Sequence, residues 1–450
     1  MPDLRCNFAG IQAPNPFWLA SGPPTNTAAQ VQRAFDQGWG GAIWKTLTDE
    51  TIKNVSSRYG GIALKSQKLM GLNNLELISD RPLADNLREL AEVKRTHPGH
   101  ALVASLMVAT RRDSWHAIVR QAQEAGVDGI ELNFGCPHGM NERGMGSAVG
   151  QVPEYSQMIC EWVKEVATVP VIAKLTPNVT DIRAIARACQ AGGADGISLI
   201  NTVNSLIGVD VHTFAPRPNV GGYGSHGGYA GPAIKPIALH LLSQLTTDPD
   251  LRTPVCGIGG IRKWEDAAEF LLLGASCVQI CAAVMHRGFG IIKGMLAGLG
   301  KWLDEKGFDH LSEAVGRSVP RIKSWSELDL NYRVLAHINE AACIHCGICY
   351  ASCEDGCFQA IHWEKLPREA YLERFGVEPR KLRGEAAPNL ALEQGQGFVD
   401  VFTVNKSACV GCNMCALVCP IEGCITMKEL PGNQPPLNWR QYQAQQPPPS

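Results

Sequence analysis

The sequence predicts an α/β protein with two domains: a (β/α)8 TIM barrel followed by a smaller α+β domain rich in cysteine. Short apolar runs alternate with amphipathic segments through the first 285 residues, which is typical of a parallel sheet covered by helices. Ten of the 17 cysteines then lie between Cys343 and Cys424, in a pattern that occurs twice. A chain of 450 residues has room for both domains, because one barrel takes about 250 residues.

Eight apolar runs are expected to form the barrel strands. They lie at Phe17–Ala20, Ala42–Lys45, Leu102–Met107, Gly129–Asn133, Val171–Lys174, Gly196–Ile200, Pro254–Gly257 and Cys277–Cys281. Most are separated by segments with helical periodicity, for example Ala29–Gln37, Leu83–Arg95, Trp115–Ala125, Tyr155–Val166, Ile182–Ala191 and Glu265–Leu273. Eight such units favour a closed barrel over an open sheet. Several runs are followed by Gly, Asn, Thr, Lys or Cys, which is where a barrel places its chemistry.

The domain boundaries follow from where this alternation stops. We expect the barrel to occupy residues 1–305, a helical connector residues 306–340, and the second domain residues 341–430. A charged insertion is expected within the second domain at about residues 362–400. The tail, residues 431–450, ends in a stretch rich in Gln and Pro and is expected to be flexible.

Composition argues against several classes of function. The formal net charge is -2, so no excess of basic residues predicts a nucleic-acid partner. Residues 1–10 lack a charged start followed by an apolar stretch, so we expect no signal peptide and a cytoplasmic protein. The longest apolar window, Ala267–Met285, is interrupted by Glu269 and Gln279. It predicts a helix that runs into a buried strand, not a membrane span.

Two cysteine quartets define the second domain. Cys343 begins a C-x2-C-x2-C-x3-C run, and the same run recurs 66 residues later from Cys409. Two-cluster ferredoxins use this spacing for [4Fe–4S] clusters, and the fourth cysteine of each run binds the other cluster. Zinc ribbons use separated pairs instead. We therefore expect a ferredoxin-like domain with one cluster on Cys343, Cys346, Cys349 and Cys419, and the other on Cys409, Cys412, Cys415 and Cys353.

Three further features of this domain matter. Cys353 is followed by Glu354, where the ferredoxin run has proline, and the two halves stand further apart than in short ferredoxins. Cys357 and Cys424 are extra cysteines, which we expect to be packing thiols. Clusters transfer electrons but cannot transform an organic molecule alone, so a second redox centre is expected in the barrel.

The loop after the fourth apolar run carries the most informative barrel motif. It reads Asn-Phe-Gly-Cys-Pro-His-Gly-Met-Asn-Glu-Arg-Gly-Met-Gly over residues 133–146, and its glycines suit a mobile lid. A cysteine on a barrel loop is usually an inert, small hydrophobic residue. Here Asn133 precedes Cys136 by three residues, a proline follows it, and the loop is rich in glycine. These features favour a reactive Cys136.

This motif resembles the active-site loop of dihydropyrimidine dehydrogenases, which are relatives of the class 1 dihydroorotate dehydrogenases. The quartets resemble the C-terminal domain of the same enzymes, including the missing proline after Cys353. The N-terminal FAD and NADPH domains of the larger eukaryotic enzyme have no counterpart in this sequence. The chain is therefore similar to the FMN/iron–sulfur subunit of the bacterial NAD-dependent enzymes. Further matches along the barrel are residues 19–21, 44–46, 74–79, 173–178, 201–203, 260–261 and 279–281.

The resemblance implies an FMN site and a pyrimidine site in the barrel mouth. The phosphate of FMN would bind backbone N–H groups around Gly231, Gly259, Gly260, Cys281 and Ala282. The flavin ring and ribityl chain would contact Ser21, Lys45, Thr46 and Lys174. Lys174 would face the N1/O2 side of reduced flavin, because a buried lysine needs an anion; Lys45 could equally be an ordinary strand-end charge. The pyrimidine would contact Asn74, Asn133, Phe134, Gly135, Asn201 and Thr202.

The resemblance also implies a reaction, the reduction of uracil or thymine to the 5,6-dihydropyrimidine in pyrimidine catabolism. Hydride would pass from N5 of FMN to C6, and Cys136 would protonate C5 as the general acid. Electrons would come from NAD(P)H through the clusters and a partner subunit that binds FAD and NAD, in an α2β2 heterotetramer. One departure from the family is Gly135, where serine is frequent.

The sequence contains one literal G-x-G-x-x-G motif, from Gly222 to Gly227. It lies in a loop rich in Pro and Gly and does not connect a strand directly to a helix, so we do not expect it to bind a dinucleotide. Two other functions stay open at this point. One is a dihydroorotate dehydrogenase-type flavoenzyme, whose site would need an additional contact for a carboxylate. The other is a non-catalytic ferredoxin-type electron carrier, against which the presence of Cys136, Lys174 and three asparagines argues.

Overall fold

The computed structural model describes residues 2–63, 69–136, 144–380, 397–432 and 434–446. The chain forms two compact units, Met1–Ile322 and Lys323–Ser450. The connector expected at residues 306–340 is therefore divided between the two units. Within it, short 3-10 helices occur at Leu311–Glu313, Val319–Arg321 and Trp325–Glu327. Part of the tail that was expected to be flexible forms helix α14 (Trp439–Ala444).

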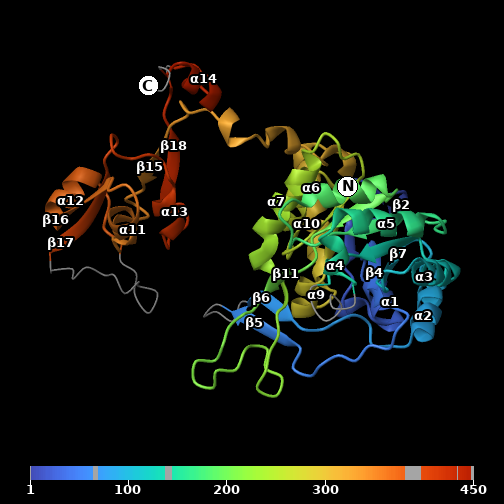
Figure 1. Ribbon diagram of the computed structural model, residues 1–450. Coiled ribbons are helices and arrows are strands. Elements are labelled where there is room, and N and C mark those ends of the chain that lie inside the picture. The colour runs from blue at the N-terminus through green and yellow to red at the C-terminus, as the bar shows by residue number, and fades with distance from the viewer. Residues whose placement is uncertain (1, 64–68, 137–143, 381–396, 433, 447–450) are drawn as a thin grey trace. The chain divides into compact units, whose positions relative to one another are not determined.

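The first unit is built around a closed barrel of parallel strands (Figure 1). In chain order these are β3 (Phe17–Leu19), β4 (Gly41–Leu47), β7 (Ala101–Leu106), β8 (Gly129–Asn133), β9 (Val171–Lys174), β10 (Gly196–Leu199), β13 (Val255–Ile258) and β14 (Ala275–Ile280). Each strand pairs with the next in this order, and β14 closes the ring by pairing with β3. Every strand falls on one of the predicted apolar runs, so the predicted barrel is confirmed.

Helices cover the outside of the barrel because each has one apolar face. In α6 the buried residues Ile182, Ile185, Ala186 and Cys189 recur at helical spacing, and the Asp181 side chain caps the first turn. The window 267–285 forms a helix and then a strand, as predicted. None of the helices in the described part of the chain is long and apolar enough to cross a membrane. The helices of this unit are α1 (Ala28–Asp36), α2 (Leu83–Thr96), α3 (Arg112–Glu124), α4 (Ser147–Gly150), α5 (Pro153–Lys164), α6 (Ile182–Ala191), α7 (Lys235–Thr246), α8 (Trp264–Leu272), α9 (Ala282–Arg287) and α10 (Ile291–Lys306).

A four-stranded antiparallel sheet extends beyond one end of the barrel (Figure 1). Its order is β11 (Val203–Ser205), β12 (Gly227–Ala230), β6 (Leu69–Asn74) and β5 (Tyr59–Ala63). Strand β11 starts four residues after β10 ends, so the sheet lies at the carboxyl ends of the barrel strands, the face where barrels place their chemistry. A separate pair, β1 (Cys6–Phe8) and β2 (Ile11–Ala13), precedes the barrel.

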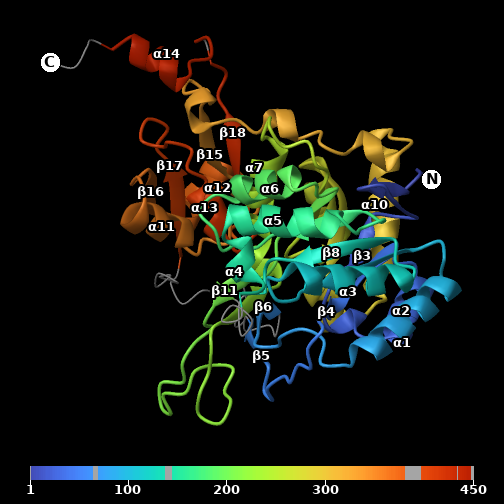
Figure 2. The same cartoon turned by 45° about the vertical axis from the view of Figure 1, so that its right-hand side comes forward.

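The second unit contains the sequence repeat as two strand–helix–strand halves (Figures 1 and 2). The first half is β15 (Val334–Ile338), α11 (Ile348–Gly356) and β16 (Ile361–Pro367), and the second is β17 (Phe398–Val404), α13 (Met414–Val418) and β18 (Ile425–Glu429). Strand β15 pairs with β18, and β16 pairs with β17, so the halves interlock. Helix α12 (Arg368–Phe375) lies in the insertion between the halves, next to β16.

Candidate active site and cluster sites

A cleft of about 1220 Å3, its open mouth included, lies at the carboxyl ends of the barrel strands. Two predicted substrate-binding residues do not line it. Phe134 is 1% exposed and packs in the barrel core, and Gly135 lies against the side chain of Asn201. The other predicted barrel residues all line the cleft: Ser21, Lys45, Thr46, Asn74, Asn133, Cys136, Lys174, Asn201, Thr202, Gly231, Gly259, Gly260, Cys281 and Ala282.

Hydrogen bonds orient the two central carboxamides. Asn133, at the end of β8, donates from Nδ2 to Thr46 Oγ1 at 3.0 Å and accepts from Asn201 Nδ2 at 2.9 Å. Asn201 Oδ1 in turn accepts from the backbone N–H of Thr202 at 2.8 Å. Ser21 Oγ lies 3.1 Å from Thr46 Oγ1. Residues at the end of β4 and β8 and just after β3 and β10 are therefore connected, and this fixes which amide atoms face the cleft.

Cys136 lies where this array meets an apolar surface. It is 7% exposed and packs with Ile52, Ile78, Met107 and Met145. Its carbonyl accepts from the N–H of Ser147 at 3.1 Å, so the loop returns to the start of α4. Residues 137–143, where a mobile lid was predicted, lie outside the described residues.

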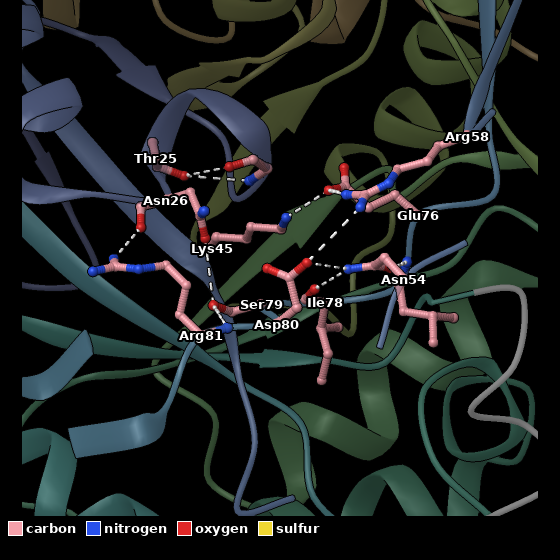
Figure 3. A network of polar contacts seen from close by, with 12 residues as sticks. Thr25, Asn26, Lys45, Asn54, Arg58, Glu76, Ile78, Ser79, Asp80 and Arg81 are labelled. Carbon is pink, nitrogen blue, oxygen red and sulfur yellow. Dashed lines mark hydrogen bonds and ion pairs between the residues drawn. The ribbon is translucent and has the colours of Figure 1, made fainter. Parts of the chain in front are cut away.

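Lys45 enters the cleft from β4 and is paired with a glutamate. Its Nζ lies 2.8 Å from Glu76 Oε1, and both side chains are at most 8% exposed. Arg58 contacts the same oxygen at 3.0 Å (Figure 3). The hydroxyl of Tyr59 donates to the other carboxylate oxygen. Burial and the hydrogen bond to Glu76 raise the pKa of the Tyr59 phenol. Lys45, Arg58 and Tyr59 therefore all donate to the Glu76 carboxylate.

Asp80 extends this network away from the cleft (Figure 3). It accepts from Asn54 Nδ2 at 3.2 Å and lies 4.0 Å from the guanidinium of Arg58. Burial acts to raise the pKa of Asp80, but the Asn54 hydrogen bond and the nearby Lys45 and Arg58 charges lower it overall. The network therefore connects the strand end that carries Lys45 with the β5–β6 hairpin.

Lys174 has its own carboxylate in the barrel interior. Its Nζ lies 3.4 Å from Glu131 Oε1, and the Glu131 side chain is fully buried. Ser198 and Gln279 donate to Glu131 Oε2 at 3.0 and 3.1 Å. The sequence argument that Lys174 would need flavin as its anion is therefore wrong in that form, because Glu131 already lies beside it.

The sequence did not identify three residues of this site: the glutamates Glu76 and Glu131 and the hairpin residue Tyr59. A signal existed for Glu131, because it lies two residues before Asn133 on the same buried strand. Residues two apart on a strand point to the same face, so both side chains face the barrel interior. No local pattern points to Glu76, because its pairing with Lys45 depends on how the β5–β6 hairpin folds over the barrel.

The other end of the cleft is formed by glycine loops. Gly260 has a φ of +75°, and a Cβ there would lie 2.7 Å from Lys235 Cβ and 2.9 Å from its backbone N. Glycine is therefore required for this close approach. Cys281 lies in the same wall, and burial raises the pKa of its thiol to about 11. His286 and Arg262 line this end too, and Nε2 of His286 is buried without a hydrogen-bond partner in the described part of the chain.

The glycine loops at one end of the cleft and the lysines at the other fit FMN. A glycine loop exposes backbone N–H groups to a phosphate, as barrels do after their seventh and eighth strands. Lys174 and Lys45 also line the cleft, each paired with a buried glutamate, and their ammonium groups would donate hydrogen bonds to a flavin ring.

The second unit contains two small cavities, each lined by five cysteines. The predicted fourth cysteine of each run lies with the three cysteines of the other run. Burial raises the pKa of Cys343 and Cys415 to about 11 and that of Cys349 to about 12, so metal binding would displace these thiol protons. The cavity of about 330 Å3 has Cys343, Cys346, Cys349, Cys419 and Cys424, and the one of about 370 Å3 has Cys353, Cys357, Cys409, Cys412 and Cys415.

Comparison with protein families agrees with both sites. The family model described as dihydroorotate dehydrogenase matches residues 3–303. The chain belongs to the dihydroorotate dehydrogenase family. Members of this family bind FMN, so the barrel is an FMN-binding oxidoreductase domain. A second model, a 4Fe-4S binding domain, matches residues 402–422 and includes the second quartet, so the chain also carries iron–sulfur chemistry.

Curated relatives extend this assignment beyond the barrel. The NAD-dependent dihydropyrimidine dehydrogenase subunit PreA of Escherichia coli (strain K12) is 41% identical over 395 residues, 88% of this chain and 96% of its own. The chloroplastic dihydropyrimidine dehydrogenase (NADP(+)) of Arabidopsis thaliana is 39% identical over 73% of this chain and 79% of its own. The catalytic subunit of dihydroorotate dehydrogenase B (NAD(+)) from Pyrococcus abyssi is 38% identical over 70% of this chain and 98% of its own.

Proposed function

We propose that this protein is the FMN/iron–sulfur subunit of a dihydropyrimidine dehydrogenase and reduces uracil or thymine to the 5,6-dihydropyrimidine. The observation that carries the proposal is that Asn74, Asn133, Asn201 and Cys136 line one cleft of an FMN-binding family. The relatives named dihydropyrimidine dehydrogenase support it. The match to the bacterial subunit spans 395 residues, more than the barrel alone can supply.

The carboxamides account for pyrimidine recognition. The edge of uracil alternates carbonyl acceptors with N–H donors, and each carboxamide provides one group of each kind. Asn133 and Asn201 are fixed by their mutual hydrogen bond, so a planar ring would meet oriented partners without a large ordering cost. Asn74 reaches the cleft from β6, where its Nδ2 lies 3.4 Å from the carbonyl of Gly228.

Cys136 accounts for proton delivery. Its thiol is positioned in the cleft wall by the β8 loop, and its apolar neighbours exclude water that would compete as a proton source. Cys136 would hold a proton at Sγ and deliver it to C5 of the pyrimidine. FMN, when held in this cleft, would supply the hydride for C6 of the pyrimidine, and the clusters held by the second unit would supply the electrons.

A partner subunit completes the electron path in this proposal. The related bacterial protein is named as a subunit of an NAD-dependent enzyme. We infer that a subunit with FAD and a nucleotide-binding fold oxidises NAD(P)H and reduces the clusters of this chain, in an α2β2 assembly. The G-x-G-x-x-G segment supports this division of labour, because it joins β11 to β12 and opens no helix.

The test is an anaerobic half-reaction on the purified holoprotein. The protein is reduced with dithionite, freed of excess reductant and mixed with uracil, thymine or orotate, while flavin absorbance and product are followed. Reoxidation by uracil or thymine with formation of the dihydropyrimidine is expected. Reoxidation by orotate alone would assign the barrel to the dihydroorotate branch of the family, and no reoxidation by any of the three would leave an electron carrier.

A further inference from the structure

The two cluster loops have the same sequence spacing but very different solvent exposure. In the first loop, residues 343–349, no residue is exposed, and Cys343, Ile344, His345, Gly347 and Cys349 are buried. In the second, residues 409–415, only Cys415 is buried, and Val410, Cys412, Asn413 and Met414 are exposed. At one repeat position Ile344 is 9% exposed and its counterpart Val410 is 59% exposed. Two loops with the same cysteine spacing therefore differ in solvent exposure.

Helix α12 of the insertion and strand β17 cover the first loop and account for its lower solvent exposure. His345, at the tip of the first loop, is 3% exposed. Its Nδ1 lies 2.9 Å from the carbonyl oxygen of Asp400 on β17, and its Nε2 lies 3.5 Å from the hydroxyl of Tyr371 on α12. Tyr371 is fully buried, packs edge-on against the His345 ring, and donates to Glu340 at 3.3 Å. One ring nitrogen of His345 thus faces β17 and the other faces α12.

The backbone of His345 adopts a conformation that favours glycine. His345 has a φ of +54°, in the left-handed region, which is unfavourable for a residue with a Cβ. The counterpart 66 residues later is Gly411, with a φ of +70°. The second loop therefore uses the residue that this conformation favours. The first loop accepts this backbone strain and gains the contacts to β17 and α12.

We propose that helix α12 and the paired strands β16 and β17 form a cap on the first cluster loop, and that His345 is the positioning residue that anchors it. The cap keeps water from the loop that holds Cys343, Cys346 and Cys349, so the first cluster is the shielded one. Within the second unit, the second cluster loop is exposed at Cys412. Solvent exposure is one of the factors that set cluster potentials. The reduced cluster carries an additional negative charge, which water stabilises, so the shielded cluster has the lower potential of the two.

The test is iron release from the full-length holoprotein to the chelator bathophenanthroline disulfonate. The wild type should release iron in two phases of about equal size, because one cluster is shielded and the other is open. His345→Gly should abolish the slow phase and leave the fast phase unchanged. This substitution also relieves the backbone strain, so loss of folding is not the expected result. In an EPR redox titration, the midpoint potential of the shielded cluster should rise towards that of the open cluster.

Two further variants keep the proposal open to refutation. Tyr371→Phe removes one hydroxyl and keeps the ring packing, so it should accelerate only the slow phase. Val410→Gly removes the exposed counterpart of Ile344 and should change neither phase. Single-phase release from the wild type, or an unchanged slow phase and unchanged potentials in His345→Gly, would overturn the proposal. None of these readouts depends on pyrimidine turnover, so the result stands apart from the proposed function.

Discussion

Gly135 lies where a side chain would collide with Asn201, a residue of the proposed pyrimidine site. A Cβ at this position would lie 2.4 Å from Asn201 Cβ and 2.5 Å from its Nδ2. Gly135→Ala should therefore displace Asn201 and break its hydrogen bond to Asn133. We expect KM for uracil to rise about tenfold, which corresponds to one lost hydrogen bond, with FMN content unchanged. Steady-state kinetics of the holoenzyme complex measures this.

The matched control is Gly294→Ala in α10, where an added Cβ meets nothing within 4 Å. It should leave KM unchanged. An unchanged KM in Gly135→Ala would show that Asn201 does not contact the pyrimidine. The comparison also bears on the serine that the family often has here: in this chain Asn201 occupies the space that a serine side chain would need.

Cys136 is expected to act only in the protonation of C5 of the pyrimidine. Cys136→Ala should retain FMN and iron and lose turnover by about 10²–10⁴-fold, because a positioned general acid contributes that much. Dithionite should still reduce the flavin, and uracil should then reoxidise it slowly. Cys281→Ala is the control, because this thiol lines the other end of the cleft and the proposed mechanism gives it no proton to deliver. Wild-type turnover in Cys136→Ala would refute the acid role.

At the residue scale, the sequence predicted which residues reach the cleft better than it predicted the side chains that contact them. Asn133, Lys174 and Asn201 were identified because polar residues follow buried strands, and the barrel brings all strand ends to one face. Their partners are not local. Glu131 comes from a different strand than Lys174, and the hydrogen bond between Asn133 and Asn201 joins residues 68 apart in sequence. Closure of the barrel is required before either contact exists.

Among the elements, α6 and the loop after α7 are joined by a partly buried ion pair, between Arg187 and Asp248, that should make stability depend on pH. Arg187 contacts both oxygens of Asp248, at 2.8 and 2.6 Å, and the Asp248 side chain is fully buried. The hydrogen bond from Arg187 lowers the pKa of Asp248 below its ordinary value of 3.8. Because the folded pKa is the lower one, the pair stabilises the fold fully above the unfolded pKa. That stabilisation is lost as pH falls through the folded pKa.

Asp248→Asn should therefore lower the free energy of unfolding by about 1.5–3 kcal/mol at pH 7, and the difference from wild type should shrink below pH about 4. Urea unfolding of the barrel, followed at several pH values, measures both effects. Asp250→Asn is the control, because Asp250 contacts the same arginine at 3.2 Å but is 67% exposed, and should change stability by less than about 1 kcal/mol. A pH-independent difference for Asp248→Asn would contradict the assignment.

The barrel strands were predictable and the sheet at the barrel mouth was not. Strands such as Val171–Lys174 are buried on both faces and read as continuous apolar runs. Strand β5 reads Tyr-Gly-Gly-Ile-Ala and is mostly exposed, so neither an apolar run nor an alternating pattern marks it. It is held by pairing with β6, which in turn pairs with β12, more than 150 residues away in sequence. Non-local pairing of this kind leaves no local signal.

For the whole molecule, the proposed function predicts that this chain alone oxidises NADH poorly. The glycine motif at residues 222–227 leads into β12, an antiparallel strand, and so lacks the strand-to-helix turn that holds a pyrophosphate. The expected result is that NADH reduces the flavin of the isolated holoprotein slowly, whereas dithionite reduces it and uracil then reoxidises it. Addition of a co-purified FAD-containing subunit should restore rapid reduction by NADH. Anaerobic stopped-flow absorbance distinguishes these cases, and rapid stoichiometric reduction by NADH without a partner would mean that the nucleotide site lies within this chain.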